Sequence, residues 1–494
     1  MEKMETVYDP MLSVEKGAVG TETTQTKNQY IATICVSLGA VCAGTALAWT
    51  SPVLPQLQEP SSALNETLNS TLQVEDTSAN SSSTSAFYLT ESQGSLVGSM
   101  LAIGALCSAL PAGYVADKFG RKKANLFLTL PYMINWLLIV FATSPFMLYV
   151  ARFFSGIATG AMCVTAPMYI GEIAEVSIRG TLGSFFQMCL CFGILLTYAV
   201  GAFMTWVGLS WILMIVPLLF AICLYFMPET PIYLVKTGQT TAAEDSLKFL
   251  RGKRYNVEPE LKTIQAGLAK SEESQAGVKD LISSIGNRKA LISALGLMLF
   301  QQLSGINAVI FYTVPIFNSA GTGIPSDLAA IIVSVVQFII AYVAAMIIDK
   351  ANRRFYLMLS SSGMCVCLAA LGLYFHLKIN HITFTGIGMI PLISLVVFII
   401  AFSLGFGPVP WMIMGELFAP EIKGVASGLA VTTNWILVFL VTFSFPIMNS
   451  SLGGHITFYL FAIIMVIGTF FVYTYIPETR GKSLQEIQNI LNKS

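Results

Sequence analysis

Amide side chains set in long apolar stretches are the residues whose chemistry can be named first. A neutral amide both donates and accepts hydrogen bonds, which matches a ring of hydroxyl groups. The flat face of an aromatic side chain suits the apolar C–H side of such a ring. Together they indicate a neutral, polyhydroxylated ligand. The amides are Gln187, Gln301, Gln302, Asn307, Gln337 and Asn434, and the accompanying aromatic residues are Phe311, Tyr312, Trp411 and Trp435.

These amides also have a simpler interpretation. Buried Asn and Gln often hydrogen-bond neighbouring helices in membranes, and for any single amide this explains its presence equally well. Gln301 and Gln302 are adjacent, so they cannot both face one point, and one of them is free for packing. The spread of the amides over both halves of the chain favours a binding site.

Charged residues form a second pattern, which occurs twice. Glu172 is followed seven residues later by Arg179-Gly, and Glu416 is followed seven residues later by Lys423-Gly. Pro-Glu-Thr likewise occurs at 228–230 and 477–479. Repeats of this kind indicate a duplicated half. The charged residues concerned are Asp117, Arg121, Glu172, Glu175 and Arg179 in the first half and Asp349, Arg353, Arg354, Glu416 and Lys423 in the second.

The repeated charges suit a gate. Carboxylates and guanidiniums at the inner ends of helices can pair between two bundles when the inside is closed and separate when it opens. Partly exposed pairs contribute about 1 kcal/mol each, enough to bias a conformational equilibrium without locking it. The alternative is that the cations only set membrane topology. Acids contribute little to topology, so the repeated carboxylates favour the gate.

The elements that carry these residues must be membrane helices. Of the 494 residues, 55% are apolar and 11% charged, too little charge to cover a water-soluble surface. Unbroken apolar runs exclude a β-barrel. We expect an all-α membrane protein with twelve transmembrane helices in two pseudo-symmetric six-helix bundles. The predicted spans are 30–55, 90–114, 124–142, 146–171, 181–205, 210–227, 290–317, 326–348, 355–376, 388–413, 424–447 and 455–476.

The distribution of Lys and Arg predicts that both termini are cytoplasmic, because cytoplasmic loops of membrane proteins carry an excess of these residues. Glycosylation sequons in the predicted outer loops agree: Asn65, Asn69 and Asn80 in loop 56–89, and Asn449 in the last outer loop, 448–454. The predicted segments are a cytoplasmic tail (1–28), a first bundle (29–227), a cytoplasmic linker with short helices starting near Thr240 and Pro259 (228–289), a second bundle (290–476) and a C-terminal tail (477–494).

Other classes of protein are disfavoured. The net charge is zero, which argues against a nucleic-acid partner. The three His residues are few and scattered, and all nine Cys lie in apolar stretches, so we expect no metal site, disulfide framework or cofactor. No nucleophile, base and orienting group cluster in a polar segment, so we expect no enzyme. Gly405 to Trp411, Pro315 and Pro446 are expected to interrupt spans ten, seven and eleven.

Several motifs together resemble the sugar porter family of the major facilitator superfamily. They are Asp117-Lys-Phe-Gly-Arg-Lys, Pro228-Glu-Thr-Pro-Ile-Tyr-Leu, Gln301-Gln-Leu-Ser-Gly-Ile-Asn, Asp349-Lys-Ala-Asn-Arg-Arg, Gly407-Pro-Val-Pro-Trp and Pro477-Glu-Thr-Arg-Gly-Lys-Ser-Leu. Within the family, insect facilitated trehalose transporters and their hexose-carrying relatives are the most similar. The resemblance implies a sugar as substrate, the bilayer as the surroundings, and function as a monomer in the cell membrane.

The resemblance also assigns roles to residues. Sugar contacts fall on the six amides and Trp411, and an outer-gate aromatic falls on Tyr312. The inner charge network falls on Glu172, Arg179, Asp349, Arg353, Glu416 and Lys423. Proton-coupled members carry an Asp in span one, whereas residues 44–49 here read Gly-Thr-Ala-Leu-Ala-Trp. A proton symporter needs a titratable group, so we expect facilitative transport of trehalose or a hexose by alternating access. A proton-coupled symporter, with Arg152 as its main intramembrane charge, and a non-transporting sugar sensor are the alternatives.

Overall fold

The computed structural model describes residues 25–58, 87–272, 282, 284–321, 323–347, 352–382, 386–418, 420–480, 482 and 484–493. This part of the chain is nearly all helical, and its one β contact is an isolated bridge between Gln58 and Leu89. Twelve of its helical segments are long and apolar enough to cross a bilayer, which confirms the predicted number of spans. Asn65, Asn69, Asn80 and Asp349 lie outside the described residues.

The first six spans form what we call the N-half (Lys27–Tyr225). Its helices are α2 and α3 (Lys27–Ala48 and Thr50–Leu57), α5 (Glu91–Phe119), α6 and α7 (Arg121–Phe127 and Thr129–Val140), α8 (Pro145–Ile173), α9 (Arg179–Gly201), and α10 and α11 (Trp206–Leu213 and Ile215–Tyr225).

The last six spans form the C-half (Ile285–Tyr475). Its helices are α16 and α17 (Ile285–Leu303 and Ile306–Ala320), α18 (Ser326–Ile347), α19 (Arg353–Ile379), η2, α20 and α21 (Ile387–Met389, Ile390–Leu404 and Val409–Leu417), α22 (Pro420–Ser451) and α23 (Gly454–Tyr475).

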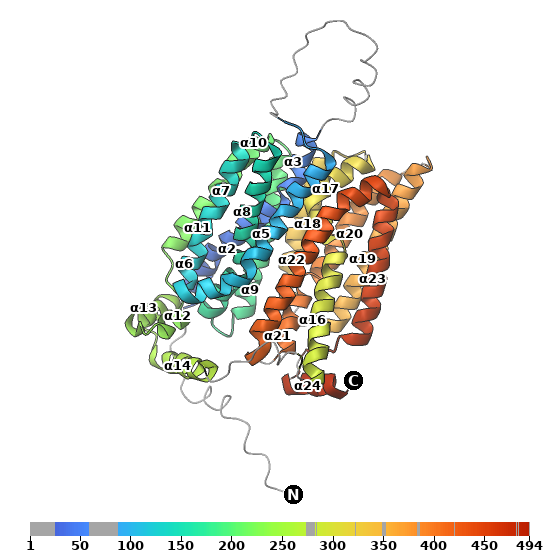
Figure 1. Ribbon diagram of the computed structural model, residues 1–494. Coiled ribbons are helices and arrows are strands. Elements are labelled where there is room, and N and C mark those ends of the chain that lie inside the picture. Colours follow the sequence, from blue (N-terminus) through green and yellow to red (C-terminus); the bar gives the residue numbers. More distant parts are fainter. Residues whose placement is uncertain are drawn as a thin grey trace.

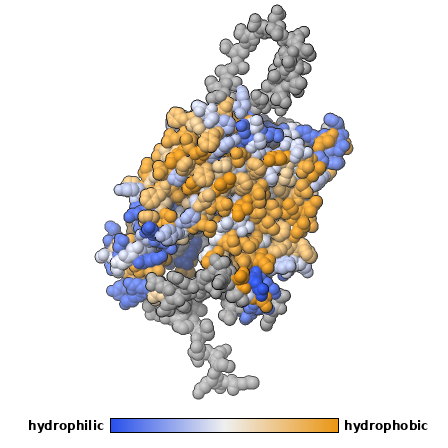
Figure 2. Space-filling model, viewed as in Figure 1, coloured by the Kyte–Doolittle hydropathy of each residue, from blue (hydrophilic) through white to orange (hydrophobic). Residues whose placement is uncertain are grey.

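The helices of the linker between the halves, and the helix after the last span, lie at one end of the molecule, which we call the linker end. The opposite end is the far end (Figure 1). Starts near Thr240 and Pro259 were predicted, and α13 (Thr240–Arg251) and α14 (Glu258–Glu272) confirm them. The sequence analysis missed α12 (Pro231–Lys236), and α24 (Leu484–Lys493) follows the last span. Apolar side chains cover the middle of the visible face, while hydrophilic ones gather at the ends and around the short helices (Figure 2).

Small residues let helices of one half pack closely. A Cβ atom on Gly104 of α5 would lie 2.1 Å from the carbonyl oxygen of Phe153 in α8, and one on Gly156 would lie 2.0 Å from that of Leu101. A Cβ atom on Gly44 of α2 would lie 2.1 Å from a carbonyl oxygen of α9. Such close backbone approach, rather than apolar burial alone, holds membrane helices together.

The two halves meet mainly along α5 with α22, α9 with α18, and α3 with α17, and α17 also touches α2. In Figure 1 the N-half and the C-half stand beside each other, with α5 and α22 at their boundary. Any solute that crosses between the halves must pass these helices, so they position the candidate site.

Breaks in the spans only partly match the sequence expectation. Span ten is interrupted, since α20 ends at Leu404 and α21 begins at Val409. Span seven breaks at Gly305, where a φ of +82° requires a residue without a Cβ atom. The expected interruption at Pro446 is wrong, because α22 runs through it as one helix. That helix also carries Asn449 in its last turn, where a loop from 448 had been expected.

Candidate functional site

Three of the predicted amides form one hydrogen-bonded chain in the C-half. Gln302 Nε2 donates to Asn434 Oδ1 over 2.6 Å, and Asn307 Nδ2 donates to Gln302 Oε1. The residues come from both sides of the Gly305 break and from α22, which faces α5 of the N-half. The bonds between described residues leave the Asn434 amide nitrogen and the Asn307 carbonyl oxygen available. The chain therefore offers one donor and one acceptor to a ligand.

Gln301 is not part of this hydrogen-bonded chain, which agrees with the expectation that two adjacent glutamines do not face the same point. Its Nε2 donates to the carbonyl oxygens of Phe406 (2.6 Å) and Gly407 (3.0 Å), in the segment between α20 and α21. Ser360 Oγ accepts from the Phe406 amide at 3.0 Å. These bonds satisfy backbone groups that the break in span ten would otherwise leave unpaired at membrane depth. Gln301 Oε1 is buried without a partner among the described residues.

The other predicted ligand contacts lie on helices that border the other half. Gln187 on α9 is exposed in the middle of a span, and its amide reaches only Cys191 Sγ of the same helix at 3.6 Å. Gln337 on α18 is 4% exposed. Its neighbour Phe338 packs against Phe192 of α9 with ring centroids 5.9 Å apart. Trp411 on α21 is 38% exposed. No direct hydrogen bond joins these three side chains to the amide chain within the described residues.

At the far end, hydrogen bonds join the two halves through the backbone of α17. Thr50 Oγ1 donates to the carbonyl oxygen of Phe311 (3.1 Å), and the Val314 amide donates to Ser51 Oγ (3.0 Å). Tyr198 of α9 donates to the Ile310 carbonyl oxygen, and its hydroxyl lies 3.1 Å from Thr313 Oγ1. The sequence analysis missed Thr50, Ser51 and Tyr198 because hydroxyl side chains in apolar helices usually bond within their own helix.

Tyr312, the predicted outer-gate aromatic, lies in this far-end contact. Its φ of −131° departs from helical geometry within α17. The hydroxyl donates to the Thr442 carbonyl oxygen at 2.8 Å, and the ring stacks on Phe445 with centroids 5.5 Å apart. A Cβ atom on Gly98 of α5 would lie 2.5 Å from the Tyr312 oxygen, so only glycine leaves room for Tyr312 there. Tyr312 therefore fills the space between the halves.

At the linker end of the N-half, Arg121 is the centre of a buried cluster. Its guanidinium, 6% exposed, lies 2.8 Å from both Asp117 Oδ1 and Glu172 Oε1. Thr230 Oγ1 donates to the second Glu172 oxygen at 2.6 Å. Glu229 accepts from the Lys122 amide at 2.9 Å, which satisfies the first turn of α6. The first Pro-Glu-Thr motif, residues 228–230, thus makes hydrogen bonds to charged residues that follow span two and end span four.

The C-half repeats the Arg–Glu–Thr part of this arrangement, while Asp349, the counterpart of Asp117, lies outside the described residues. Arg353 Nη2 lies 3.3 Å from Glu416 Oε1, and Thr479 Oγ1 donates to Glu416 Oε2 at 2.5 Å. Glu478 accepts from the backbone amides of Arg353 (3.0 Å) and Arg354 (3.1 Å). The repeat seen in the sequence is therefore a repeat of contacts as well, and Thr230 and Thr479 join the charged residues in it.

The remaining predicted gate residues lie at the same end but make few contacts. Arg179 is exposed and donates to the Ala174 carbonyl oxygen of its own loop at 3.4 Å, and Lys423 is exposed. Glu175 donates its amide to Gln29 Oε1 at 2.9 Å. Every ion pair between described residues lies within one half or its linker, so the pairing of charges between halves stays a prediction.

Among the described residues, Arg152 is a fully buried charged residue, and its contacts could not be predicted from the sequence. Its Nη1 donates to the Ala46 carbonyl oxygen (2.5 Å) and its Nε to that of Val97 (3.3 Å). The guanidinium lies 5.6 Å from the centre of the Trp49 ring. Within the described residues Arg152 has no carboxylate partner. Its hydrogen-bond partner on span one is a backbone carbonyl oxygen, that of Ala46.

Comparisons with known proteins test the predicted family and fold. Residues 32–491 match the model of the family described as "Sugar (and other) transporter". The chain is 38% identical over 462 residues to the facilitated trehalose transporter Tret1 of Anopheles gambiae, covering 93% of this chain and 55% of that protein. It is 38% identical over 465 residues to Tret1 of Culex quinquefasciatus, covering 94% and 86%.

A solved structure agrees on the fold. The xylose transporter XylE from E. coli, in a partially occluded inward open conformation, has a TM-score of 0.75 at 24% identity, covering 93% of this chain and 100% of that one. At this identity the likeness shows the fold alone. The chain spans about half the length of the Anopheles relative, 55%. Because the family match extends over nearly all the spans, the chain belongs to the Sugar (and other) transporter family.

Proposed function

We propose that this protein carries a neutral sugar, trehalose or a hexose, across the membrane by facilitative alternating access. The observation that carries the proposal is the contrast between the two ends. Hydrogen bonds between the halves close the far end, whereas the charged clusters at the linker end bond only within their own half. This contrast supports a state in which the far end is the closed one.

The amide chain supplies the substrate contacts of this proposal. Asn434 and Asn307 offer a donor and an acceptor, and Gln187 and Trp411 are exposed at mid-span although both lie in apolar helices. Sugar hydroxyls both donate and accept, so the hydroxyls of a sugar ring suit both ends of the chain. Trp411 adds an aromatic face for the ring. Gln337 and the buried Gln301 oxygen complete the proposed contacts.

Uniport follows from the surroundings of Arg152. A symporter couples transport to a group that binds and releases a proton near neutral pH. Around Arg152 the described partners are the carbonyl oxygens of Ala46 and Val97 and the ring of Trp49, none of which titrates near neutral pH. Arginine itself stays protonated. A proton-coupled symporter is therefore the second candidate.

The membrane arrangement is part of the proposal. The linker end carries the Lys and Arg clusters of α6, α13 and the loop to α14, so it faces the cytoplasm in the cell membrane. Glycosylation at Asn65, Asn69 and Asn80 then falls outside the cell. Asn449 is less accessible to glycosylation because it lies in the last turn of a spanning helix. In line with the family resemblance, we propose that the transporter acts as a monomer.

Uptake into proteoliposomes tests the proposal. Labelled trehalose and glucose are supplied outside, with and without a protonophore, and equilibration down the sugar gradient is expected in both conditions. Uptake that requires a proton gradient would replace uniport with symport. Sugar binding without uptake would make the protein a sensor.

Asn434→Ala tests the site itself. It breaks the bond from Gln302 and leaves a buried amide unpaired, a loss of about 1–3 kcal/mol. The half-saturating sugar concentration should rise by roughly 5- to 100-fold. Thr433→Ala is the matched control, because that hydroxyl bonds only to the Leu429 carbonyl oxygen of its own helix (2.9 Å). Equal effects of the two substitutions would remove Asn434 from the site.

A further inference from the structure

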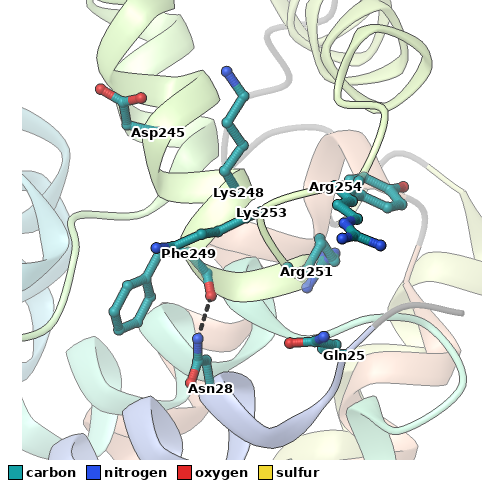
Figure 3. A pocket seen from close by; sticks show the side chains of 10 residues that line it. Gln25, Asn28, Asp245, Lys248, Phe249, Arg251, Lys253 and Arg254 are labelled. Carbon is teal, nitrogen blue, oxygen red and sulfur yellow. Dashed lines mark hydrogen bonds between the residues drawn. The ribbon is translucent and has the colours of Figure 1, made fainter. Parts of the chain in front are cut away.

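A polar pocket of about 960 Å³ lies at the linker end, away from the amide chain. It opens between the start of α2, the last turn of α13 and the loop from α13 to α14. Gln25, Asn28, Lys248, Arg251, Lys253 and Arg254 are among the residues that line it. Figure 3 shows Arg251 and Arg254 projecting toward the same side, above Gln25. The volume is that of a small-molecule site.

The pocket is built by specific contacts. Asn28 Nδ2 donates to the Phe249 carbonyl oxygen at 2.6 Å, the bond drawn in Figure 3. The backbone N–H of Gln25 donates to the backbone carbonyl oxygen of Arg251 at 2.8 Å. Gly252, with a φ of +115°, ends α13 and turns the chain toward Lys253. Gln25, just before α2, and Asn28, in its first turn, thus satisfy two of the last carbonyl groups of α13, which reduces the negative end of that helix in the pocket.

Arg251 lies at the bottom of the pocket and is held there by contacts with two other segments. Its side chain is 5% exposed and lies 2.8 Å from Glu260 Oε1, and Nη1 donates to the carbonyl oxygen of Ile173 at the end of α8 (2.8 Å). Its charge is therefore balanced by Glu260. The pocket is held against the same loop that carries Glu175, whose amide donates to Gln29 of α2 (2.9 Å).

The charge left in the pocket is positive. Lys253 and Arg254 are exposed and form no ion pair within the described residues, and Lys248 is 3.7 Å from Glu244. Asp245 is the one acid in the lining. Burial raises the pKa of Tyr255 to about 12, so its phenol stays neutral at physiological pH. Two unpaired cations beside amide donors are the chemistry that binds a phosphate group.

We propose that this pocket binds a phosphate-bearing ligand through Lys253 and Arg254, with Gln25 and Lys248 contributing at its sides. The same chemistry is offered by a soluble polyphosphate and by an anionic lipid headgroup. Bound there, the ligand would hold the start of α2 against α13 and stabilise the linker end in the arrangement seen here.

Thermal unfolding of the full-length, detergent-solubilised protein with sodium tripolyphosphate tests the soluble source. Flotation with phosphatidylcholine vesicles, with or without phosphatidylinositol 4,5-bisphosphate, tests the lipid source. The test variant is Lys253→Gln/Arg254→Gln. The control is Lys262→Gln, which removes an exposed cation of α14 outside the pocket. Removing two cations should weaken binding by about tenfold or more, and the control should change it less than twofold.

A rise in Tm with tripolyphosphate that the double variant loses supports the proposal with a soluble ligand. Selective flotation with the bisphosphate vesicles that the double variant loses supports it with a lipid. Binding that persists in the double variant, or that Lys262→Gln also loses, overturns it, as does the absence of both responses. Because neither measurement uses sugar uptake, a failure here is separate from a failure of the proposed transport.

Discussion

The two ends of the molecule hold their helices together in different ways. At the far end, Thr50, Ser51 and Tyr198 bond across the boundary between the halves, to backbone groups of α17. At the linker end, Arg121 and Arg353 bond to carboxylates of their own half. The far-end bonds are neutral and must break when that end opens. The charged clusters can persist in either state, since each moves with its own half.

The two kinds of contact therefore suit different roles: the hydrogen bonds between the halves can break during a conformational change, and the ion pairs stabilise each half. A neutral hydrogen bond has a net contribution of about 0.5–1.5 kcal/mol, so several of them bias an equilibrium without fixing it. A buried ion pair costs about 3–5 kcal/mol when one partner is removed. Evidence for the gate is therefore strongest at the far end, where the sequence analysis identified only Tyr312, and the clusters serve to keep each half rigid.

Gly98→Leu should break the comparison most strongly. A Cβ atom at Gly98 would lie 2.5 Å from the Tyr312 oxygen, so a leucine there obstructs closure of the far end. Overpacking of this kind costs about 1–3 kcal/mol or more, which we expect to lower sugar uptake at least tenfold. Gly113→Leu on the same helix is the control, since a Cβ atom there has no neighbour within 4 Å. Normal uptake by Gly98→Leu would show that Tyr312 does not close the far end.

Glu172→Gln and Glu416→Gln compare the two clusters with each other. Glu172 is 13% exposed beside an Arg121 that is 6% exposed, whereas Glu416 is 31% exposed with a longer contact of 3.3 Å. We expect a loss of about 2–3 kcal/mol for Glu172→Gln and about 1 kcal/mol for Glu416→Gln. The Tm of the purified protein in detergent measures both.

A double-mutant cycle sharpens this result. If the loss in Glu172→Gln comes from a buried Arg121 guanidinium left with Asp117 as its one remaining carboxylate among the described residues, adding Arg121→Gln should recover part of the Tm. Losses that simply add would mean that the Arg121–Glu172 contact does not hold the N-half together. Equal losses for Glu172→Gln and Glu416→Gln would mean that burial does not distinguish the clusters.

Much of the fold could be predicted from the sequence because its signals are local. Each span is a continuous apolar run, and the doubled Glu172 and Glu416 patterns show the repeat without any structure. The paired contacts of Thr230 and Thr479 were not predicted, although both follow the repeated Pro-Glu. Their hydroxyls matter only because the motif folds back onto the carboxylates of another span.

The candidate site was harder to predict because its geometry is not local. The sequence analysis grouped six amides, and the structure joins Gln302, Asn307 and Asn434 while assigning Gln301 to the break in span ten. Whether a break occurs depends on packing as well as residue type: Pro446 leaves α22 continuous, while Gly305 interrupts span seven. Residue types alone could not distinguish these outcomes.

Tyr198→Phe gives the smallest effect and the most direct test of the comparison. It removes the hydroxyl that donates to the Ile310 carbonyl oxygen of the other half. Tyr374→Phe is its matched control, because that hydroxyl also donates to α17, at Ala320 (2.8 Å), but within the C-half. Losing the contacts of this hydroxyl with Ile310 and Thr313, about 1 kcal/mol in net, should raise the population with an open far end by roughly fivefold in Tyr198→Phe only. Distances between spin labels on α3 and α17 measure that population. The same shift in Tyr374→Phe would mean that the loss of a bond to α17, rather than its crossing between the halves, opens the far end.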